Sequence, residues 1–519
     1  MTAGKTPFST FLLRAAVQDD VFRKLFERGI PLEGGLDGRF VPVPSTRLPP
    51  RWLAAVRPFL ATEAEKFSLF SESPAGMMFV RRGARAFVIT FGHAWQQLEP
   101  QWLELDFGRR IALNAIPPDQ LLEVNTEQIF AKWHLARERA PKATSVREFA
   151  LEHDRDLVAA LEGVPSEKVF GGALRGSISL RMSIEFAEVA NALDRAATLF
   201  ESDAYKNDWP EIDNLVPASN SDTATLDALL DADLQSGVAR SHAVLFSPNF
   251  RRGDQLAAES YSFGRRQKEQ ATAPYLLYGS WERFLQGLKQ KPSLESAKST
   301  PVHLFDEGGE PFAKHTVYEC LGYEVSHDSH QYFLSSGIWY RATDNFVTTV
   351  NSAINLLKRS PVALPAWNGV NSEGEYNKSC CVDKDMLHFD AKNIPFGGGQ
   401  SKFEFCDFLN TRHKVLFFAK IPTRSSDCSH LVEQVRRTVE LLFGPENEFR
   451  RKLKGVMRRH YPKVTADWLD GRPRPGDWNF CLVSLGKKKK ELPFFAKCGI
   501  RRLVKSLEQI GHPVSFESV

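Results

Sequence analysis

Acidic, basic and amide side chains follow one another at the ends of apolar runs between residues 373 and 442. Glu375 lies in a segment that we expect to be helical, Asp407 ends one strand-like run, and Lys420 ends the next. Gln434 lies on a second helical segment. Carboxylates bind Mg²⁺ through oxygen, and the ion polarises a phosphate and lowers the pKa of an attacking water. A nearby lysine orients that water and stabilises the developing charge. This order of residue types predicts a metal site that acts on a phosphodiester.

The arrangement resembles the core of PD-(D/E)xK nucleases, in which a helix supplies a glutamate and two neighbouring strands supply the other groups. One strand ends in an acid, and the next carries an acid two positions before a lysine. Glu375, Asp407 and Lys420 take three of these positions, with residues 410–413 as the turn between the strands. The catalytic set predicted from the sequence is therefore Glu375, Asp407, Lys420 and Gln434.

One position departs from this pattern, because Phe418 stands where the second acid belongs. The metal ligands must then come from Asp407 together with Glu404 or Asp390. Asp407 and Glu404 are three positions apart, so on an ideal strand they face opposite sides, and a bulge is needed to bring them together. A second arrangement would use Asp390-Ala391-Lys392 as the acid-x-lysine element. The alternative interpretation is that these groups make ordinary polar contacts, or that the core binds nucleic acid without cutting it.

The composition is that of a globular protein. The chain has 519 residues, of which 42% are hydrophobic and 25% are charged. No run approaches the ~20 apolar residues that span a bilayer, and residues 1–7 lack the apolar core of a signal peptide. We therefore expect a cytoplasmic protein without a membrane partner. The seven cysteines include no C-x-x-C pair, which argues against a zinc cage or a disulfide scaffold.

Positive charge is concentrated at the C-terminal end. Residues 451–519 carry 16 Lys+Arg against 6 Asp+Glu, whereas the preceding 450 residues carry 51 against 57. A basic end on a near-neutral body is typical of contact with nucleic-acid phosphates. The predicted contact residues are Arg451, Lys452, Lys454, Arg458, Arg459, Lys487, Lys488, Lys489 and Lys490. The alternative is a solvated helix face followed by a charged hairpin tip at the lysine run.

Apolar periodicity predicts a multi-unit α+β protein. We expect four units, namely an α+β unit (1–122), a mainly helical unit (123–240), a strand-rich α+β unit (241–360) and a C-terminal α/β unit with the nuclease-like core (361–519). Within them, the pattern predicts helices over 146–161 and 182–199 and a single strand over 403–409. An antiparallel pair is predicted from 315–325 and 331–342.

Motifs along most of the chain resemble a sporadically distributed bacterial family of unknown function, domain of unknown function 6119. The stretches that carry the resemblance are 90–93 (TFGH), 107–114 (FGRRIALN), 334–340 (LSSGIWY), 375–377 (EYN), 404–407 (EFCD), 429–431 (SHL) and 492–497 (LPFFAK). The resemblance brings no activity with it. Patchy occurrence implies a mobile accessory gene, and such genes often act in conflict with phages or plasmids.

The sequence thus predicts a protein that engages DNA or RNA, with Mg²⁺ as the expected cofactor of a phosphodiesterase in anti-phage or anti-plasmid defence. The first alternative is a non-catalytic nucleic-acid sensor. The second is an adaptor that recognises a protein partner through residues 1–360.

Overall fold

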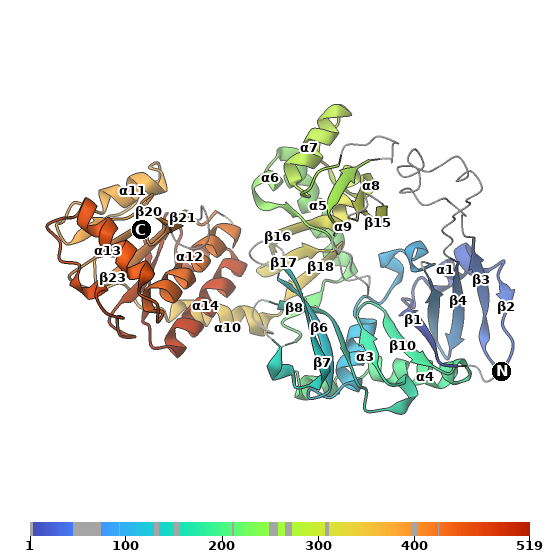
Figure 1. Cartoon of the computed structure of the whole chain (residues 1–519). Coiled ribbons are helices and arrows are strands. Elements are labelled where there is room, and N and C mark those ends of the chain that lie inside the picture. The colour runs from blue at the N-terminus through green and yellow to red at the C-terminus, as the bar shows by residue number, and fades with distance from the viewer. Residues whose placement is uncertain are drawn as a thin grey trace, which may run out of the picture. The chain divides into compact units, whose positions relative to one another are not determined.

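The computed structural model divides the chain into two compact units (Figure 1). The N-terminal unit comprises Met1–Gln128 and His134–Arg341, and the C-terminal unit comprises Ala342–Val519 with Ile129–Trp133. The structure describes residues 4–44, 74–92, 94–128, 134–149, 156–209, 212–248, 258–264, 272–306, 311–395, 402–423 and 425–519. Within these ranges no helix is both long and apolar enough to cross a membrane. The mixture of helices and sheets confirms the predicted α+β class.

A ten-stranded antiparallel sheet forms the first part of the N-terminal unit, with the strand order β2-β3-β4-β5-β1-β10-β9-β8-β6-β7. Strands β4 and β5 form a hairpin, with Gly83 at a φ of +56° in the turn. The strands are β1 (Thr6–Leu12), β2 (Ile30–Pro31), β3 (Asp37–Val43), β4 (Ala75–Arg82), β5 (Arg85–Phe91), β6 (Leu121–Gln128), β7 (His134–Thr144), β8 (Asp156–Gly163), β9 (Leu174–Gly176) and β10 (Leu180–Ile184).

The prediction of a mainly helical segment after residue 122 was wrong, because β6, β7 and β8 continue this sheet. The predicted helix over 146–161 is replaced by a short 3₁₀ turn, Val146–Glu148, and by β8. Strand β8 pairs with both β6 and β9, so hydrogen bonds from two neighbours outweigh its helix-like apolar spacing. Over 182–199 the helical part is α4 (Val189–Phe200), which packs with α3 (Phe107–Ala115) against the sheet.

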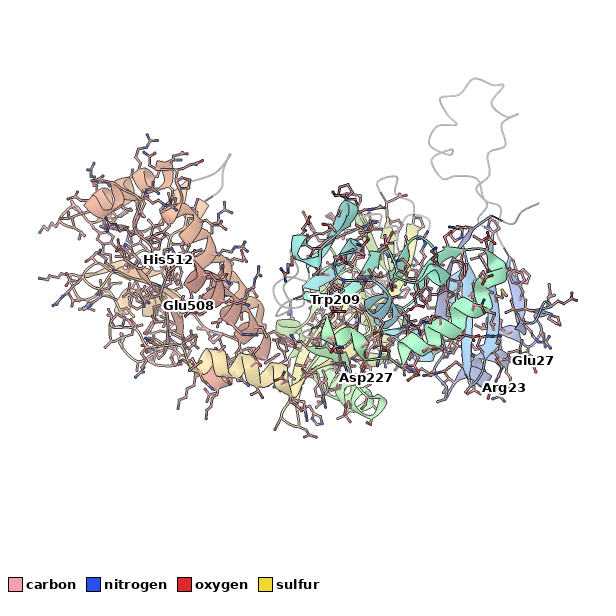
Figure 2. All side chains as sticks on the ribbon, turned by 90° about the horizontal axis from the view of Figure 1, so that it is seen from below. Arg23, Glu27, Trp209, Asp227, Glu508 and His512 are labelled. Atoms are coloured by element: carbon pink, nitrogen blue, oxygen red, sulfur yellow. The ribbon has the colours of Figure 1, made fainter. Side chains whose placement is uncertain are left out.

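Two smaller sheets complete the N-terminal unit, one with the order β11-β18-β17-β16-β12 and one with the order β13-β14-β15. Buried Asp227, labelled in Figure 2, accepts hydrogen bonds from Tyr318 at 2.7 Å, Trp339 at 2.9 Å and Lys298 at 2.6 Å. The predicted antiparallel pair is present in part, as β16 and β17, because a helix over 317–320 replaces the start of the first strand and the second is divided into β17 and β18. The strands are β11 (Leu215–Pro217), β12 (Val244–Leu245), β13 (Ser260–Phe263), β14 (Pro301–Phe305), β15 (Pro311–Thr316), β16 (Leu321–His327), β17 (His330–Ser335) and β18 (Ile338–Ala342).

Five helices pack around these two sheets. They are α5 (Asn220–Ser236), α6 (Ala239–His242), α7 (Tyr278–Gly287), α8 (Leu294–Ser299) and α9 (Val317–Cys320). Their apolar residues form one core with the strands, centred on fully buried Trp281.

The C-terminal unit has a five-stranded sheet with the order β19-β22-β23-β24-β25. Strands β23, β24 and β25 are parallel, whereas β19, β22 and β23 are linked as antiparallel pairs. Helices α12 and α13 lie between β23 and β24 in the chain. The elements are α10 (Asp344–Asn355), α11 (Glu373–Ser379), β19 (Met386–His388), β22 (Phe408–Asn410), β23 (Val415–Lys420), α12 (Ser425–Phe443), α13 (Glu448–His460), β24 (Asn479–Ser484), α14 (Phe494–Gln509) and β25 (Val514–Ser518).

Helices cover both faces of this sheet. Residues of α10, α12, α13 and α14 form one core with Phe418 and its neighbours, and α11 packs on the other face through Tyr376. His512, labelled in Figure 2, lies at the first of these cores, with its ring centroid 4.2 Å from that of Phe443. Helix α10 belongs to this unit, so the division of the chain falls after Arg341 and not at residue 360.

Candidate metal centre

Three carboxylates converge in the C-terminal unit. Asp390 follows β19, Glu404 ends the short strand β21 (Lys402–Glu404), and Asp407 directly precedes β22. One ligand oxygen from each lies within 4.8 Å of the other two. These are the three residues that the sequence predicted as metal ligands, and we call them the acidic cluster.

An interruption between strands β21 and β22 brings Glu404 and Asp407 together. The sequence predicted one continuous strand over 403–409, but that prediction was wrong. Strand β21 pairs with β20 (Asn393–Pro395) in a separate two-stranded sheet, and β22 joins the main sheet. The two residues between them, Phe405 and Cys406, are fully buried outside any strand. Because the backbone changes direction here, the alternation rule no longer separates the two carboxylates.

Asp407 is held rigidly between two strands. Its Oδ2 accepts the backbone N–H of Ala419 at 2.5 Å, and its own N–H donates to the carbonyl of Phe417 at 3.1 Å. Its carbonyl accepts the N–H groups of Phe389 and Asp390, each at 2.7 Å. Burial raises the pKa of Asp407 to about 8, and the charges of Glu404 and Asp390 act in the same direction.

The other two members are fixed from the turn after β19. Glu404 accepts the N–H of Ala391 at 2.7 Å through Oε1, and Ala391 has a φ of +61° in that turn. Burial raises the pKa of Glu404, and neighbouring Asp390 raises it further. Asp390 accepts a hydrogen bond from Asn377 Nδ2 at 3.2 Å. The cluster is therefore a set of desolvated acids that repel one another, which a bound cation would relieve.

Two buried polar atoms beside Asp390 lack hydrogen-bond partners in the described part of the chain. Asn377 is 2% exposed, and its Oδ1 has no donor. His388 Nε2 is also without a partner and lies 4.0 Å from Asp390 Oδ2. Burial lowers the pKa of His388, and Lys392 lowers it further. Oxygen ligands with an unsatisfied oxygen beside them fit a hydrated hard divalent cation such as Mg²⁺.

Lys420 reaches a glutamate of α11, but not the predicted one. Its Nζ donates to Glu373 Oε2 at 2.7 Å, and the N–H of Ile421 donates to Glu373 Oε1 at 2.9 Å. The carboxylate of Glu375 instead accepts the N–H of Ser372 at 2.8 Å and forms the capping box of α11. The pattern Ser372-x-x-Glu375 is a capping-box signature, so the sequence did contain the signal that separates the two glutamates.

The structure also places Gln434 and Phe418. Gln434 lies on α12 one turn before Thr438, whose hydroxyl donates to the carbonyl of Phe405 at 2.6 Å. Gln434 Nε2 is buried without a hydrogen-bond partner among the residues that the structure describes. Phe418 is fully buried, with its ring stacked on Phe480. Position 418 thus supplies no carboxylate, and the acidic cluster is made of Asp390, Glu404 and Asp407.

The basic residues of α13 differ in whether they form ion pairs with acidic side chains. Arg451, Arg458 and Arg459 are exposed. Lys452 pairs with Glu448 at 2.8 Å, and Lys454 pairs with Asp467 at 3.6 Å and with Asp470. Unpaired positive charge is thus greatest at the last turn of the helix.

The lysine run 487–490 is not a hairpin tip, because the segment after it is helix α14 and not a strand. A 3₁₀ turn, Lys489–Glu491, connects it to that helix. Lys489 is half-buried, and its Nζ donates to the carbonyl of Leu357 at 2.5 Å. Burial lowers the pKa of Lys489. Lys487 and the exposed Lys488 and Lys490 complete the run.

A model of the DUF6119 family, a family of unknown function, matches residues 8–519. The chain belongs to this family. The match covers both units, so the acidic cluster lies within the DUF6119 region. No curated protein and no solved structure matches the DUF6119 chain.

Proposed function

We propose that the C-terminal unit is a metal-dependent phosphodiesterase that acts on nucleic acid. The observation that carries this proposal is the convergence of Asp390, Glu404 and Asp407, in a unit where Lys420 ends the strand that holds Asp407. In chain order, α11, β19, β22, β23, α12 and β24 supply one helix, three antiparallel strands, a helix and a parallel strand, with β20 and β21 inserted after β19 and α13 inserted after α12. That is the order expected of a PD-(D/E)xK core, and it supports the same reading.

Each residue has a distinct task in this proposal. Asp390, Glu404 and Asp407 would hold Mg²⁺, which supplies a nucleophilic water at neutral pH and polarises the phosphate. Lys420, kept in place by Glu373, would donate hydrogen bonds to the water or to a phosphate oxygen. The attacking water gives one proton to solvent as its oxygen bonds to phosphorus, the ester P–O bond breaks, and the leaving oxygen takes a proton from solvent.

The proposal is tested by incubating the full chain with labelled DNA and RNA in Mg²⁺, Mn²⁺ or EDTA. We expect cleavage that requires the ion and that Asp407→Asn and Lys420→Ala both abolish. Asp383→Asn is the control, because Asp383 is exposed and lies outside the acidic cluster. Cleavage that persists in EDTA, or that survives both substitutions, would contradict the proposal.

A second candidate is a non-catalytic nucleic-acid sensor, which is favoured by Phe418 in place of the second acid of the motif. It predicts binding that weakens steeply with salt, survives Asp407→Asn and is accompanied by no cleavage in any metal. Either activity would suit a protein that acts on phage or plasmid nucleic acid, the role that we infer from the sporadic occurrence of the family.

A further inference from the structure

The C-terminal end of α13 is anchored on the chain segment that carries Asp390. Tyr461, which caps this helix, donates its hydroxyl hydrogen to the carbonyl of His388 at 2.5 Å. Its ring centroid lies 5.9 Å from that of Phe389 and 5.4 Å from Lys392 Nζ. His388 and Phe389 directly precede Asp390. The end of α13 therefore borders the acidic cluster.

Free positive charge gathers at this same end. Arg458, Arg459 and Lys463 are exposed, and none of them forms an ion pair with another described residue. Earlier in the helix, by contrast, Lys452 and Lys454 are paired with acids. We call Arg458, Arg459 and Lys463 the α13 basic end.

We propose that the α13 basic end binds the phosphate backbone of a nucleic-acid strand and guides it past the acidic cluster. This inference rests on the proposed function, and it selects Arg458 and Arg459 from the contact residues predicted from the sequence and adds Lys463. An anionic strand must approach a cluster of carboxylates that repels it, so unpaired positive charge at the helix end that contacts the Asp390 segment offsets that repulsion. Arginine also matches a phosphate with two parallel hydrogen bonds.

The lysine run is the second basic group of this unit. It follows β24, whose last residue, Ser484, pairs with Lys420 at the end of β23. Lys489 is engaged with the carbonyl of Leu357, and its Nζ lies 5.9 Å from the ring of Phe516 on β25, the edge strand opposite β19. The run therefore leads toward the β25 edge and not toward Asp390, and its other lysines serve as the comparison.

The test is fluorescence anisotropy of the full chain with labelled DNA and RNA oligonucleotides, in Ca²⁺ and between about 50 and 300 mM salt. One variant carries Arg458→Gln, Arg459→Gln and Lys463→Gln, and its control carries Lys487→Gln, Lys488→Gln and Lys490→Gln. Each removes three positive charges. Each lost phosphate contact reduces the magnitude of the slope of log K against log salt by about 1. We therefore expect the slope of the first variant to be smaller in magnitude by about 2–3 and its affinity to be at least tenfold lower. The control should keep the slope of the unmodified protein.

A third variant, Arg458→Lys with Arg459→Lys, keeps the charge and should keep most of the slope, which separates charge from folding defects. An unchanged slope in the first variant, or an equal loss of slope in the lysine-run control, would refute the α13 basic end as the binding surface. Neither result would contradict the proposed function. In that case the basic residues serve only to stabilise the negative end of the helix dipole. Absence of binding by the unmodified protein would overturn both.

Discussion

Replacing Asp407 by asparagine should stabilise the metal-free protein while removing its metal site. The carboxyl is 7% exposed and is surrounded by other acids. Asparagine has nearly the same shape, and its amide oxygen can still accept the N–H of Ala419. Its NH₂ group can donate to the oxygens of Glu404 or Asp390. The substitution therefore removes a buried charge without opening a cavity or leaving an orphaned donor.

The size of the effect follows from the pKa of Asp407, which burial raises from 3.8 to about 8 in the folded protein. Below pH 3.8 the carboxyl is protonated in both the folded and the unfolded chain, so it does not affect stability. As the pH rises from there, only the unfolded chain ionises, and folding loses about 1.4 kcal/mol per pH unit. The accumulated cost near pH 8 is on the order of 5 kcal/mol. Asparagine avoids this cost.

Hydrogen exchange measured on peptides covering residues 405–420, in EDTA at several pH values, reports this difference locally. We expect the ratio of the protection factor of Asp407→Asn to that of the unmodified protein to rise by up to tenfold per pH unit between about pH 4 and 8. Asp383→Asn should show no such trend. Mg²⁺ should protect the unmodified protein but not Asp407→Asn. Equal protection of the two proteins at every pH would refute the reasoning about the buried charge.

Three further predictions concern the surroundings of the cluster. Glu373→Gln breaks the ion pair with Lys420, so it should lower the cleavage rate about 10–100-fold. Glu375→Gln should leave the cleavage rate unchanged. Equal rates for the two variants would contradict the assignment of Glu373 as the residue that positions Lys420. Phe418→Asp places a charge in the core, so urea unfolding should show a loss of about 3–5 kcal/mol with no gain in activity. Lys392→Met removes one of the influences that lower the pKa of His388. An NMR titration of this variant should give His388 a pKa that is higher than in the unmodified protein but still below 6.5, because burial persists. An unchanged pKa of His388 would contradict this prediction.

The elements of the C-terminal unit could largely be predicted from the sequence, because its strands are short apolar runs with polar turns between them. Asp407 directly precedes β22 and does not end a strand, whereas Lys420 does end β23, and these two strands are neighbours. The prediction failed where tertiary pairing decides the local structure. The break at Phe405 is one example, since nothing in the apolar run 403–409 marks the point at which the chain leaves one sheet for another.

The candidate site was predictable in composition but not in every role. The three acids are recognisable from residue type, whereas only the capping pattern after Ser372 distinguishes Glu375, which caps α11, from Glu373, which pairs with Lys420. The environments of Asn377 and His388 depend on side-chain burial, which a single sequence does not encode locally. Likewise, the internal contact of Lys489 could not be seen in a run of identical lysines.

The central claim is that Asp390, Glu404 and Asp407 together bind a divalent cation. Crystals of the full chain grown with Mn²⁺, with diffraction data collected at the manganese edge, test it directly. We expect an anomalous peak about 2.0–2.3 Å from an oxygen of each of the three carboxylates, which Asp407→Asn removes. Well-ordered carboxylates without such a peak, at a Mn²⁺ concentration that saturates other sites, would contradict it.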